Sequence, residues 1–348
     1  RHICRLRPAV DGTQNRRDRM TGIATMARRA VQAAAIICMG VAMAACDNEI
    51  SLKPQSGGEP YSVLLLADDM ETGGNLADEL ERPAPGLPQQ EKSLDVTLTS
   101  DTVLTQATRY ARCIVIARTG KSQKPAIRYE KDVYSKPQLL VYVDMPTALT
   151  AANGAKHITE PLSRLINRFE IKAETDELKK RNNTKGTKAV AEQTACSMLI
   201  PADMQSIKRG KGFVWLSDNA ASGMQSICVY SYPGYDRSTP TLVAKRDSVM
   251  RANIPGEEDG MYMRTSRRAP VYGKETNSNG RRATELRGLW EMAGDAMGGP
   301  FVCIATADSS RGRTIVAEGF VYAPEKTKRN LIRQIEAALH TLQPKKLK

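Results

Sequence analysis

The chain has 348 residues, and its 51 Lys and Arg outnumber 38 Asp and Glu, which gives a formal net charge of +13. No two of its seven cysteines lie within three residues of one another, which excludes the CxxC pairs typical of zinc and redox sites. Serine-hydrolase signatures of the GxSxG type are also absent, so we expect no metal, no cofactor and no catalytic residue that a motif identifies.

The amino-terminal region divides at Met26. Residues 1–25 begin with Arg1 rather than Met and are polar and rich in arginine, so we expect them to be translated upstream sequence outside the fold. After Met26, two arginines precede an uncharged run that ends at Cys46. A short positive region, an apolar region and small residues before a cleavage point predict a signal peptide over residues 26–45.

The phrase Met43-Ala44-Ala45-Cys46 resembles the bacterial lipoprotein box, in which the cysteine receives acyl chains. Ordinary signal cleavage and a retained membrane anchor are the alternatives. As a helix, Ala33–Ala45 would span roughly 20 Å against about 30 Å for a hydrocarbon core, which favours a signal peptide over an anchor. We therefore expect an envelope protein, held in the outer membrane by lipid on Cys46.

The sequence after Cys46 indicates which side of the membrane the protein could face and which partners its charge suits. Asp47 and Glu49 are similar to a surface-export signal, so both a periplasm-facing and a surface-exposed position are open. Residues 1–45 hold eight Lys and Arg and two Asp and Glu, so cleavage lowers the net charge from +13 to +7. A positive balance suits lipid headgroups or polyanionic glycans. We expect an envelope protein or glycan as partner, and no nucleic acid.

Residues 46–60 contain prolines and glycines and predict a tether. The following first lobe, residues 61–182, combines apolar runs of strand length with helical patterns. Its predicted strands and helices, with an intervening turn, are strands Tyr61–Ala67, Leu94–Leu98, Arg112–Ala117 and Gln138–Met145, helices Asn75–Glu81 and Leu162–Lys180, and the turn Pro83–Pro88.

A polar stretch around Lys179–Lys188 predicts the boundary to a second lobe, residues 189–342, which a basic tail, 343–348, follows. Phe301–Ala305 and Thr314–Tyr322 predict a hairpin that is buried on both faces. The other predicted elements are strands Ala195–Ile200, Gly212–Leu216, Ser226–Tyr232 and Met261–Thr265, a helix from Thr239-Pro240 to Pro255-Gly256, and a final helix Glu325–Leu342. We expect an α+β fold of two lobes, each a mostly antiparallel or mixed sheet covered by helices.

The remaining cysteines and histidines suggest packing rather than chemistry. Cys113, Cys196, Cys228 and Cys303 lie in or beside apolar runs and are expected to be buried free thiols, with a disulfide as the alternative. His340 is expected on the surface of the final helix.

One polar constellation is a candidate binding pocket: Arg287, Glu291 and Asp295, with Trp290 among them. If this segment is helical, the three charged residues share a face and could form a pocket or do acid/base work. The alternative is a structural pair on the surface, with Trp290 filling the core. On the helix that starts at Thr239, Arg246, Asp247 and Arg251 are expected to form a solvated face.

Several phrases resemble domain-of-unknown-function family 4837, a family of Bacteroidota lipoproteins. They include Arg287–Glu291 with Met297–Val302, Glu318–Pro324, and Pro85–Gln89, and the resemblance extends over about residues 55–342. It implies an envelope lipoprotein with no assigned activity, cofactor or catalytic residue.

The leading hypothesis is a non-catalytic binding or assembly module of the cell envelope. The rival is a lipid-anchored hydrolase or transferase that acts on envelope glycan through Arg287, Glu291 and Asp295. Convergence of at least two carboxylates in a cavity would favour the enzyme.

Mass spectrometry of protein extracted from membranes should find no peptide upstream of Cys46 and an acylated amino terminus, because the cysteine is the lipid acceptor in the lipoprotein box. A soluble mature protein that begins at another residue would contradict this prediction.

Overall fold

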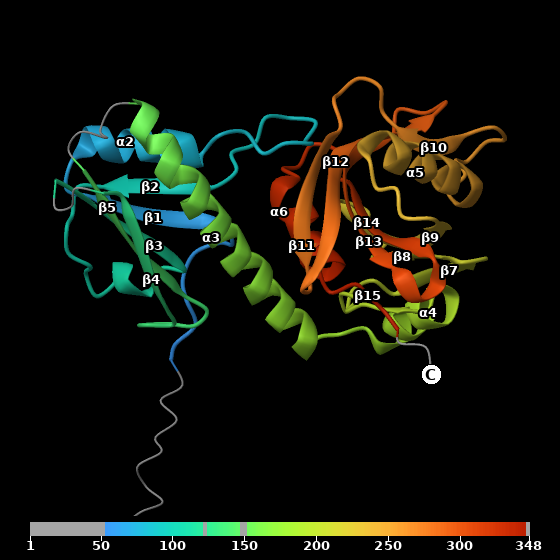
Figure 1. Ribbon diagram of the computed structural model, residues 1–348, viewed down its shortest axis with the longest axis horizontal. Coiled ribbons are helices and arrows are strands. Elements are labelled where there is room, and N and C mark those ends of the chain that lie inside the picture. Colours follow the sequence, from blue (N-terminus) through green and yellow to red (C-terminus); the bar gives the residue numbers. More distant parts are fainter. Residues whose placement is uncertain (1–52, 121–123, 147–151, 346–348) are drawn as a thin grey trace, which may run out of the picture. The chain divides into compact units, whose positions relative to one another are not determined.

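The computed structural model describes residues 53–120, 124–146 and 152–345, and the chain from Lys53 onward forms one compact unit (Figure 1). The expected signal peptide and Cys46 lie outside the described residues. Within the described ranges, every helix is too short or too polar to cross a bilayer.

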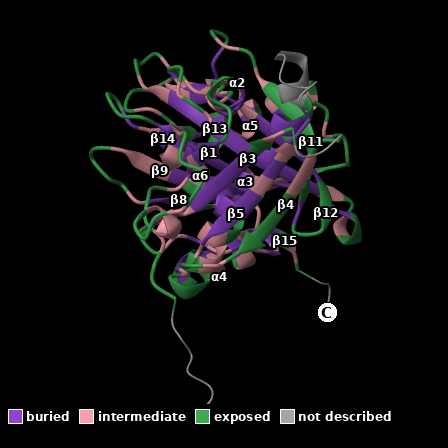
Figure 2. Ribbon diagram, turned by 90° about the vertical axis from the view of Figure 1, so that its left-hand side faces the viewer, coloured by how far each residue is buried: buried purple, intermediate pink, exposed green. Residues whose placement is uncertain are grey.

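A mixed five-stranded sheet of order β2-β1-β3-β5-β4 forms the first lobe. β1, β2, β3 and β5 run parallel, and β4 is antiparallel to β5. The strands are β1 (Ser62–Ala67), β2 (Asp95–Thr99), β3 (Cys113–Thr119), β4 (Ala126–Lys131) and β5 (Leu139–Met145), and the helices are α2 (Met70–Leu80) and α3 (Ala152–Lys180). Both helices pack on one face of the sheet. β3 and β5 are buried while β4 is largely exposed, so the apolar β3 and β5 were predictable and β4 was not (Figure 2).

The aspartate doublet after β1 fixes the start of α2. The Asp69 carboxylate accepts a hydrogen bond from the Thr72 backbone N–H at 2.7 Å and caps the helix. The Asp68 carboxylate accepts from the Thr119 N–H at 2.9 Å and ties β1 to the end of β3. Both acids therefore serve the fold.

An antiparallel sheet of order β10-β12-β13-β14-β9-β8-β7 forms the second lobe, and β11 also pairs with β12. The strands are β7 (Ser206–Gly210), β8 (Phe213–Ser217), β9 (Met224–Pro233), β10 (Tyr262–Thr265), β11 (Tyr272–Ser278), β12 (Arg281–Ala293), β13 (Gly298–Asp308) and β14 (Arg313–Tyr322), and a small ladder joins β6 (Cys196–Ser197) to β15 (Gln343–Pro344). The two lobes together confirm the predicted α+β class.

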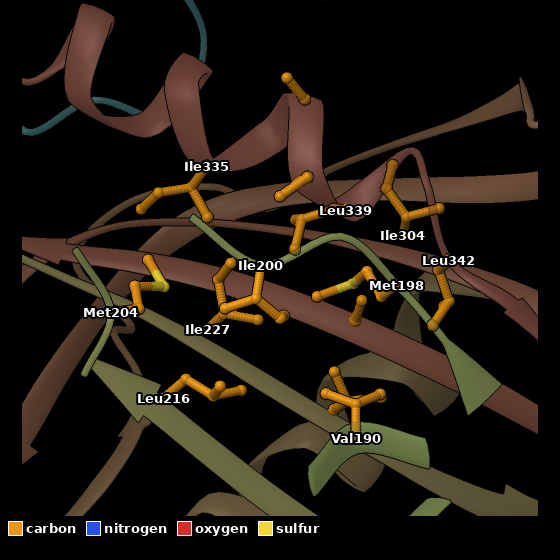
Figure 3. Packing of buried hydrophobic residues seen from close by; sticks show 14 of the residues in the cluster. Val190, Met198, Ile200, Met204, Leu216, Ile227, Ile304, Ile335, Leu339 and Leu342 are labelled. Carbon is orange, nitrogen blue, oxygen red and sulfur yellow. The ribbon is translucent and has the colours of Figure 1, made fainter. Parts of the chain in front are cut away.

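Helices cover both faces of this sheet, which explains its strands that are apolar on each side. α4 (Thr184–Thr194) and α6 (Arg329–Leu339) pack on one face, and α5 (Thr239–Asn253) packs on the other. Figure 3 shows Ile335 and Leu339 of α6 in the first of these cores, with Val190 of α4 at its far side. A Cβ at Gly319 would lie 2.3 Å from Ile335 Cγ2, so this glycine allows α6 to approach β14 closely.

The predicted hairpin is confirmed: β13 and β14 pair with Ala305 opposite Val316, at the centre of the sheet. The four predicted cysteines are free and buried, which confirms the packing interpretation over a disulfide.

Other expectations were wrong in position or kind. The helix α4 was missed because its residues are mostly polar. The strand expected over Ala195–Ile200 is reduced to β6, and the final helix begins at Arg329 rather than Glu325. The helix predicted from Thr239 is α5, which begins at Thr239 with Ser238 in the N-cap position and ends at Asn253, before Pro255.

Trp290→Ala should lower the free energy of unfolding by about 3–5 kcal/mol, since truncation of a buried tryptophan leaves a large cavity. Trp290 is 2% exposed, contacts the Phe320 ring edge at a centroid distance of 5.5 Å, and donates a hydrogen bond to the Val321 carbonyl at 3.2 Å. Equilibrium urea unfolding measures the loss. Trp215→Ala is the control and should cost at most about 2 kcal/mol, because Trp215 is partly exposed. Equal losses for the two variants would contradict the assignment of Trp290 to the core.

Candidate functional site

The structure separates the four residues of the sequence-predicted pocket. They lie on β12 and in the turn after it, so the expectation that a helix presents Arg287, Glu291 and Asp295 on one face was wrong. Four residues along a strand span about 13 Å, so Arg287 and Glu291 share a face of β12 without meeting. Trp290 points to the opposite face, and Asp295 is exposed in the turn. Of these four residues, Arg287 alone lines the large cavity described below.

Glu291 belongs to a separate surface pair. Its carboxylate accepts hydrogen bonds from Arg264 Nε at 2.9 Å and from the Ser266 hydroxyl at 2.7 Å. The Ser266 hydrogen bond, then Arg264, lower the pKa of Glu291. The carboxylate is thus held by its neighbours on β10 and in the loop after it.

Arg287 bridges two buried carboxylates on different elements. Its Nε donates to Glu285 on β12 at 2.6 Å, and its Nη2 donates to Glu336 on α6. Lys274 on β11 adds a second cation 3.1 Å from Glu285. The guanidinium therefore connects the sheet to the helix that covers it.

The charges in this cluster keep one another ionised. Burial raises the pKa of Glu336, but the Arg287 guanidinium and the neighbouring His340 outweigh burial and hold that pKa well below its usual range. Burial lowers the pKa of Arg287, and the two carboxylates outweigh it and raise that pKa. A carboxylate with so low a pKa is a poor proton donor near neutral pH. The cluster is suited to holding structure rather than to proton transfer.

Glu285, Glu336 and His340 also place one potential metal-ligand atom each within 4.8 Å of one another. However, Arg287 contacts both carboxylates, so a metal cation would have to displace its guanidinium. The surface position expected for His340 was wrong: its side chain is 14% exposed, and its Nε2 lies 3.7 Å from Glu336. We assign this cluster to the ion pairs and not to a metal.

Arg287 forms part of the wall of a cavity of about 790 Å³. Its walls come from α3, α6, β11, β12 and the turn that contains Pro85. Figure 1 labels these two helices and two strands. The polar face of α6 points into it, and the residues on this face follow helical spacing: Arg329, Arg333, Glu336 and His340. α6 therefore packs on the sheet with one side and borders the cavity with the other.

Residues of the first lobe complete the cavity and fix α6. The Glu91 carboxylate accepts hydrogen bonds from the backbone N–H groups of Lys328 at 2.7 Å and Arg329 at 2.9 Å, at the positive end of the helix dipole. Arg329 in turn donates to Asp95 at 2.6 Å.

The turn predicted over Pro83–Pro88 packs directly on β12. Gly86 has a φ of +76°, and a Cβ there would lie 3.0 Å from the Cβ of Arg287. Leu87, the next residue, packs against the core beneath α6. Glycine thus satisfies both a left-handed backbone and a close approach.

Arg333 is a candidate site residue that the sequence analysis missed. Its guanidinium carbon lies 4.0 Å from the centre of the Tyr61 ring, and Nη1 is inaccessible to solvent and has no hydrogen-bond acceptor among the described residues. Burial lowers the pKa of Arg333. Its position four residues after Arg329 and three before Glu336 was the available signal, but this pattern equally fits a solvated face.

Arg246 was expected on a solvated face of α5, and this expectation was wrong. Arg246 is fully buried, donates through Nε and Nη2 to Glu318 at 3.0 and 2.8 Å, and lies over the Phe301 ring. Its spacing of four from Leu242 and Met250 indicates the buried face. The pair of Arg246 and Glu318 is enclosed by the core and lines none of the cavities described. We therefore assign it to the packing of the core and not to a functional site.

The fold and the cavity define a two-lobed α+β protein with a ligand-sized cavity whose lining includes charged side chains. Residues 183–341 match the model for a domain of unknown function, DUF4837. Residues 56–183 match a different domain of unknown function, DUF8532. The family resemblance is therefore confirmed for the second lobe, whereas its expected extent over residues 55–342 was too long.

Similarity to solved structures is low. The Ran-binding protein Mog1p of Saccharomyces cerevisiae aligns with 9% identity over 43% of this chain and 90% of its own, with a TM-score of 0.29. A point mutant of protein Mog1 aligns over the same shares with 9% identity and a TM-score of 0.27. Such scores carry no argument about function. No curated protein shows significant sequence similarity to the chain.

Arg287→Met should lower the free energy of unfolding by about 3–5 kcal/mol near pH 7, because it leaves buried carboxylates without their cation. The pKa of Glu336 is depressed in the native protein, so its stabilising effect is present above the unfolded pKa and is lost as pH falls toward the folded pKa. In the variant, Arg287 no longer opposes the effect of burial, so the pKa of Glu336 rises. Protonation of Glu336 then removes the cost of keeping an unpaired carboxylate charge buried.

The gap in stability between native protein and variant should therefore narrow between about pH 7 and about pH 4. Urea unfolding across this range measures it. Arg264→Met, which removes the cation of the more exposed Glu291 pair, is the control and should change stability little. A gap for Arg287→Met that stays constant with pH would show that Glu285 and Glu336 are not its cause.

Proposed function

We propose that the chain is a lipid-anchored protein of the bacterial cell envelope that binds a ligand in the cavity on the polar side of α6, without catalysing a reaction. The observation that carries the binding role is the cavity itself. Its volume of about 790 Å³ falls in the usual range for small-molecule sites, roughly 300–1,000 Å³. Its walls come from segments far apart in the chain, and ion pairs hold them in place before any ligand arrives.

The charge arrangement favours binding over catalysis. A hydrolase acting through Arg287, Glu291 and Asp295 would need these residues together, but Glu291 pairs with Arg264 outside the cavity. The carboxylates that do lie in the cavity beside Arg287 are held by it as ion pairs. General acid catalysis needs a pKa near the working pH, and the low pKa of Glu336 does not meet that requirement.

The location rests on the sequence around Cys46. Lipid on Cys46 would attach the protein to the outer membrane, facing the periplasm or the cell surface. The tether predicted over residues 46–60 is too long, because backbone hydrogen bonds attach Pro54 and Gly57 to the first lobe, so a tether would be confined to the residues before Lys53. The net charge of +7 expected after cleavage suits an acidic partner, such as an envelope glycan, and an envelope protein is the other partner class.

Thr276→Trp should abolish binding in the cavity. Thr276 lies on β11 opposite Ala283, and Lys274, two residues earlier, contacts Glu285, so Thr276 shares the face of the sheet that borders the cavity. An indole at this position would project into the cavity and obstruct a ligand there. The native protein should be stabilised in thermal-shift assays by at least one member of a panel of disaccharides and short peptides that differ in charge.

Lys211→Trp is the matched control. Lys211 is exposed between β7 and β8 and does not line the cavity, so this variant should keep full ligand-induced stabilisation. If Thr276→Trp folds and binds the same compound as tightly as the native protein, the cavity is not the binding site. Absence of stabilisation by every panel member would contradict the proposed function.

A further inference from the structure

The cations that border the cavity differ in how they are neutralised. Arg287 contacts Glu285 and Glu336, and Arg329 contacts Asp95. Arg333 lies between these two arginines along the cavity wall, and no described carboxylate lies within ion-pairing distance of it. Arg333 is therefore the cation on α6 whose charge the described residues leave without a counterion.

The surroundings of Arg333 make this uncompensated charge unfavourable. Burial lowers the pKa of Arg333, and the nearby cations Arg287 and Arg329 lower it further, against the opposing effects of Tyr61 and Glu336. Because a guanidinium stays protonated in proteins, the positive charge remains in place. The Tyr61 ring supplies a cation–π contact at 4.0 Å but no oxygen to Nη1. Burial also raises the pKa of Tyr61, so its phenol stays neutral.

The lining of the cavity as a whole, Arg333 included, carries more positive than negative side chains. Seven Lys and Arg line it against four Glu, and Arg168 of α3, like Arg333, has no ion pair with a described carboxylate. Amide and hydroxyl side chains such as Asn167 and Thr276 complete the lining and can bond to a polar ligand. Unpaired positive charge within walls of low dielectric attracts anions and strengthens their binding.

We infer that the cavity binds a small polar ligand through an anionic group, a carboxylate or a phosphate, which accepts hydrogen bonds from the guanidinium of Arg333. The planar guanidinium presents paired donors whose spacing matches two oxygens of either group. Because Nη1 is enclosed, the Nε and Nη2 donors are the pair that would contact the ligand. This inference rests on the proposed binding function and adds the charge of the ligand and the residue that recognises it.

Isothermal titration calorimetry with three probes tests the inference: a disaccharide that ends in glucuronate, the corresponding disaccharide that ends in glucose, and inorganic phosphate. The glucuronate probe or phosphate should bind, and the glucose probe should bind at least about 10-fold more weakly than the tighter anion, since hydrogen bonds to charged groups contribute strongly. Preference for glucuronate over phosphate would identify a carboxylate ligand, and the reverse preference a phosphate. Equal binding of the glucose and glucuronate probes, without binding of phosphate, would overturn the inference.

Arg333→Met tests the assigned residue, because it removes the charge while keeping a long side chain beside Tyr61. Affinity for the anionic probe should fall about 10-fold or more. The melting temperature without ligand should be no lower than that of the native protein, since an unpaired buried charge has been removed. A purely structural arginine would instead lower the melting temperature and leave the affinity of the folded protein unchanged, which would overturn the inference.

Arg181→Met is the matched control: Arg181 is exposed beyond the end of α3 and does not line the cavity, so affinity should stay within about twofold of the native value. The results also separate this inference from the proposed function. A neutral probe that binds, and that Thr276→Trp excludes, would keep the binding function and overturn the anionic ligand. An anionic probe that Thr276→Trp does not exclude would contradict the cavity as the site.

Discussion

The bridge from Arg287 to Glu285 and Glu336 is the interaction on which the arrangement of the second lobe and its cavity depends. It joins a strand and the helix above it through buried charges, so both partners must stay in register for either carboxylate to be satisfied. The same arginine supports the turn at Gly86 from the first lobe. A single arginine thus contacts the final helix through its guanidinium and the turn at Gly86 through its Cβ.

The short final helix α6 has two structural roles, one on its apolar side and one on its polar side. Its apolar residues, among them Ile335 and Leu339, complete a core, while its polar residues border the cavity. Packing on the apolar side fixes the backbone, which lets the polar side hold an arginine without a partner. Rigid support of this kind would allow Arg333, in its proposed role, to remain without a hydrogen-bond partner until a ligand binds.

Much of the fold was predictable because the apolar pattern of many segments agrees with their burial in the folded protein. The β13–β14 hairpin combines continuous apolar runs with a Ser-Arg-Gly turn, and buried cysteines lie in apolar runs. The exposed strands β4 and β11 were missed, since edge strands need few apolar residues. Arg333 and His340 were beyond sequence reasoning for another reason: a polar helix face gives the same pattern beside a cavity and in water, and only long-range packing decides between them.

The capping of α6 by Glu91 links residues more than two hundred positions apart. During synthesis, the first lobe leaves the ribosome long before the helix whose start it must cap, and that helix also carries Arg333. A chain interrupted before Arg329 would already contain β1 to β14, yet it would lack the helix that closes the cavity. The cavity that we propose as the binding site is consequently completed only when most of the chain has been synthesised, and a chain that stops before Arg329 lacks the arginine proposed to contact the ligand.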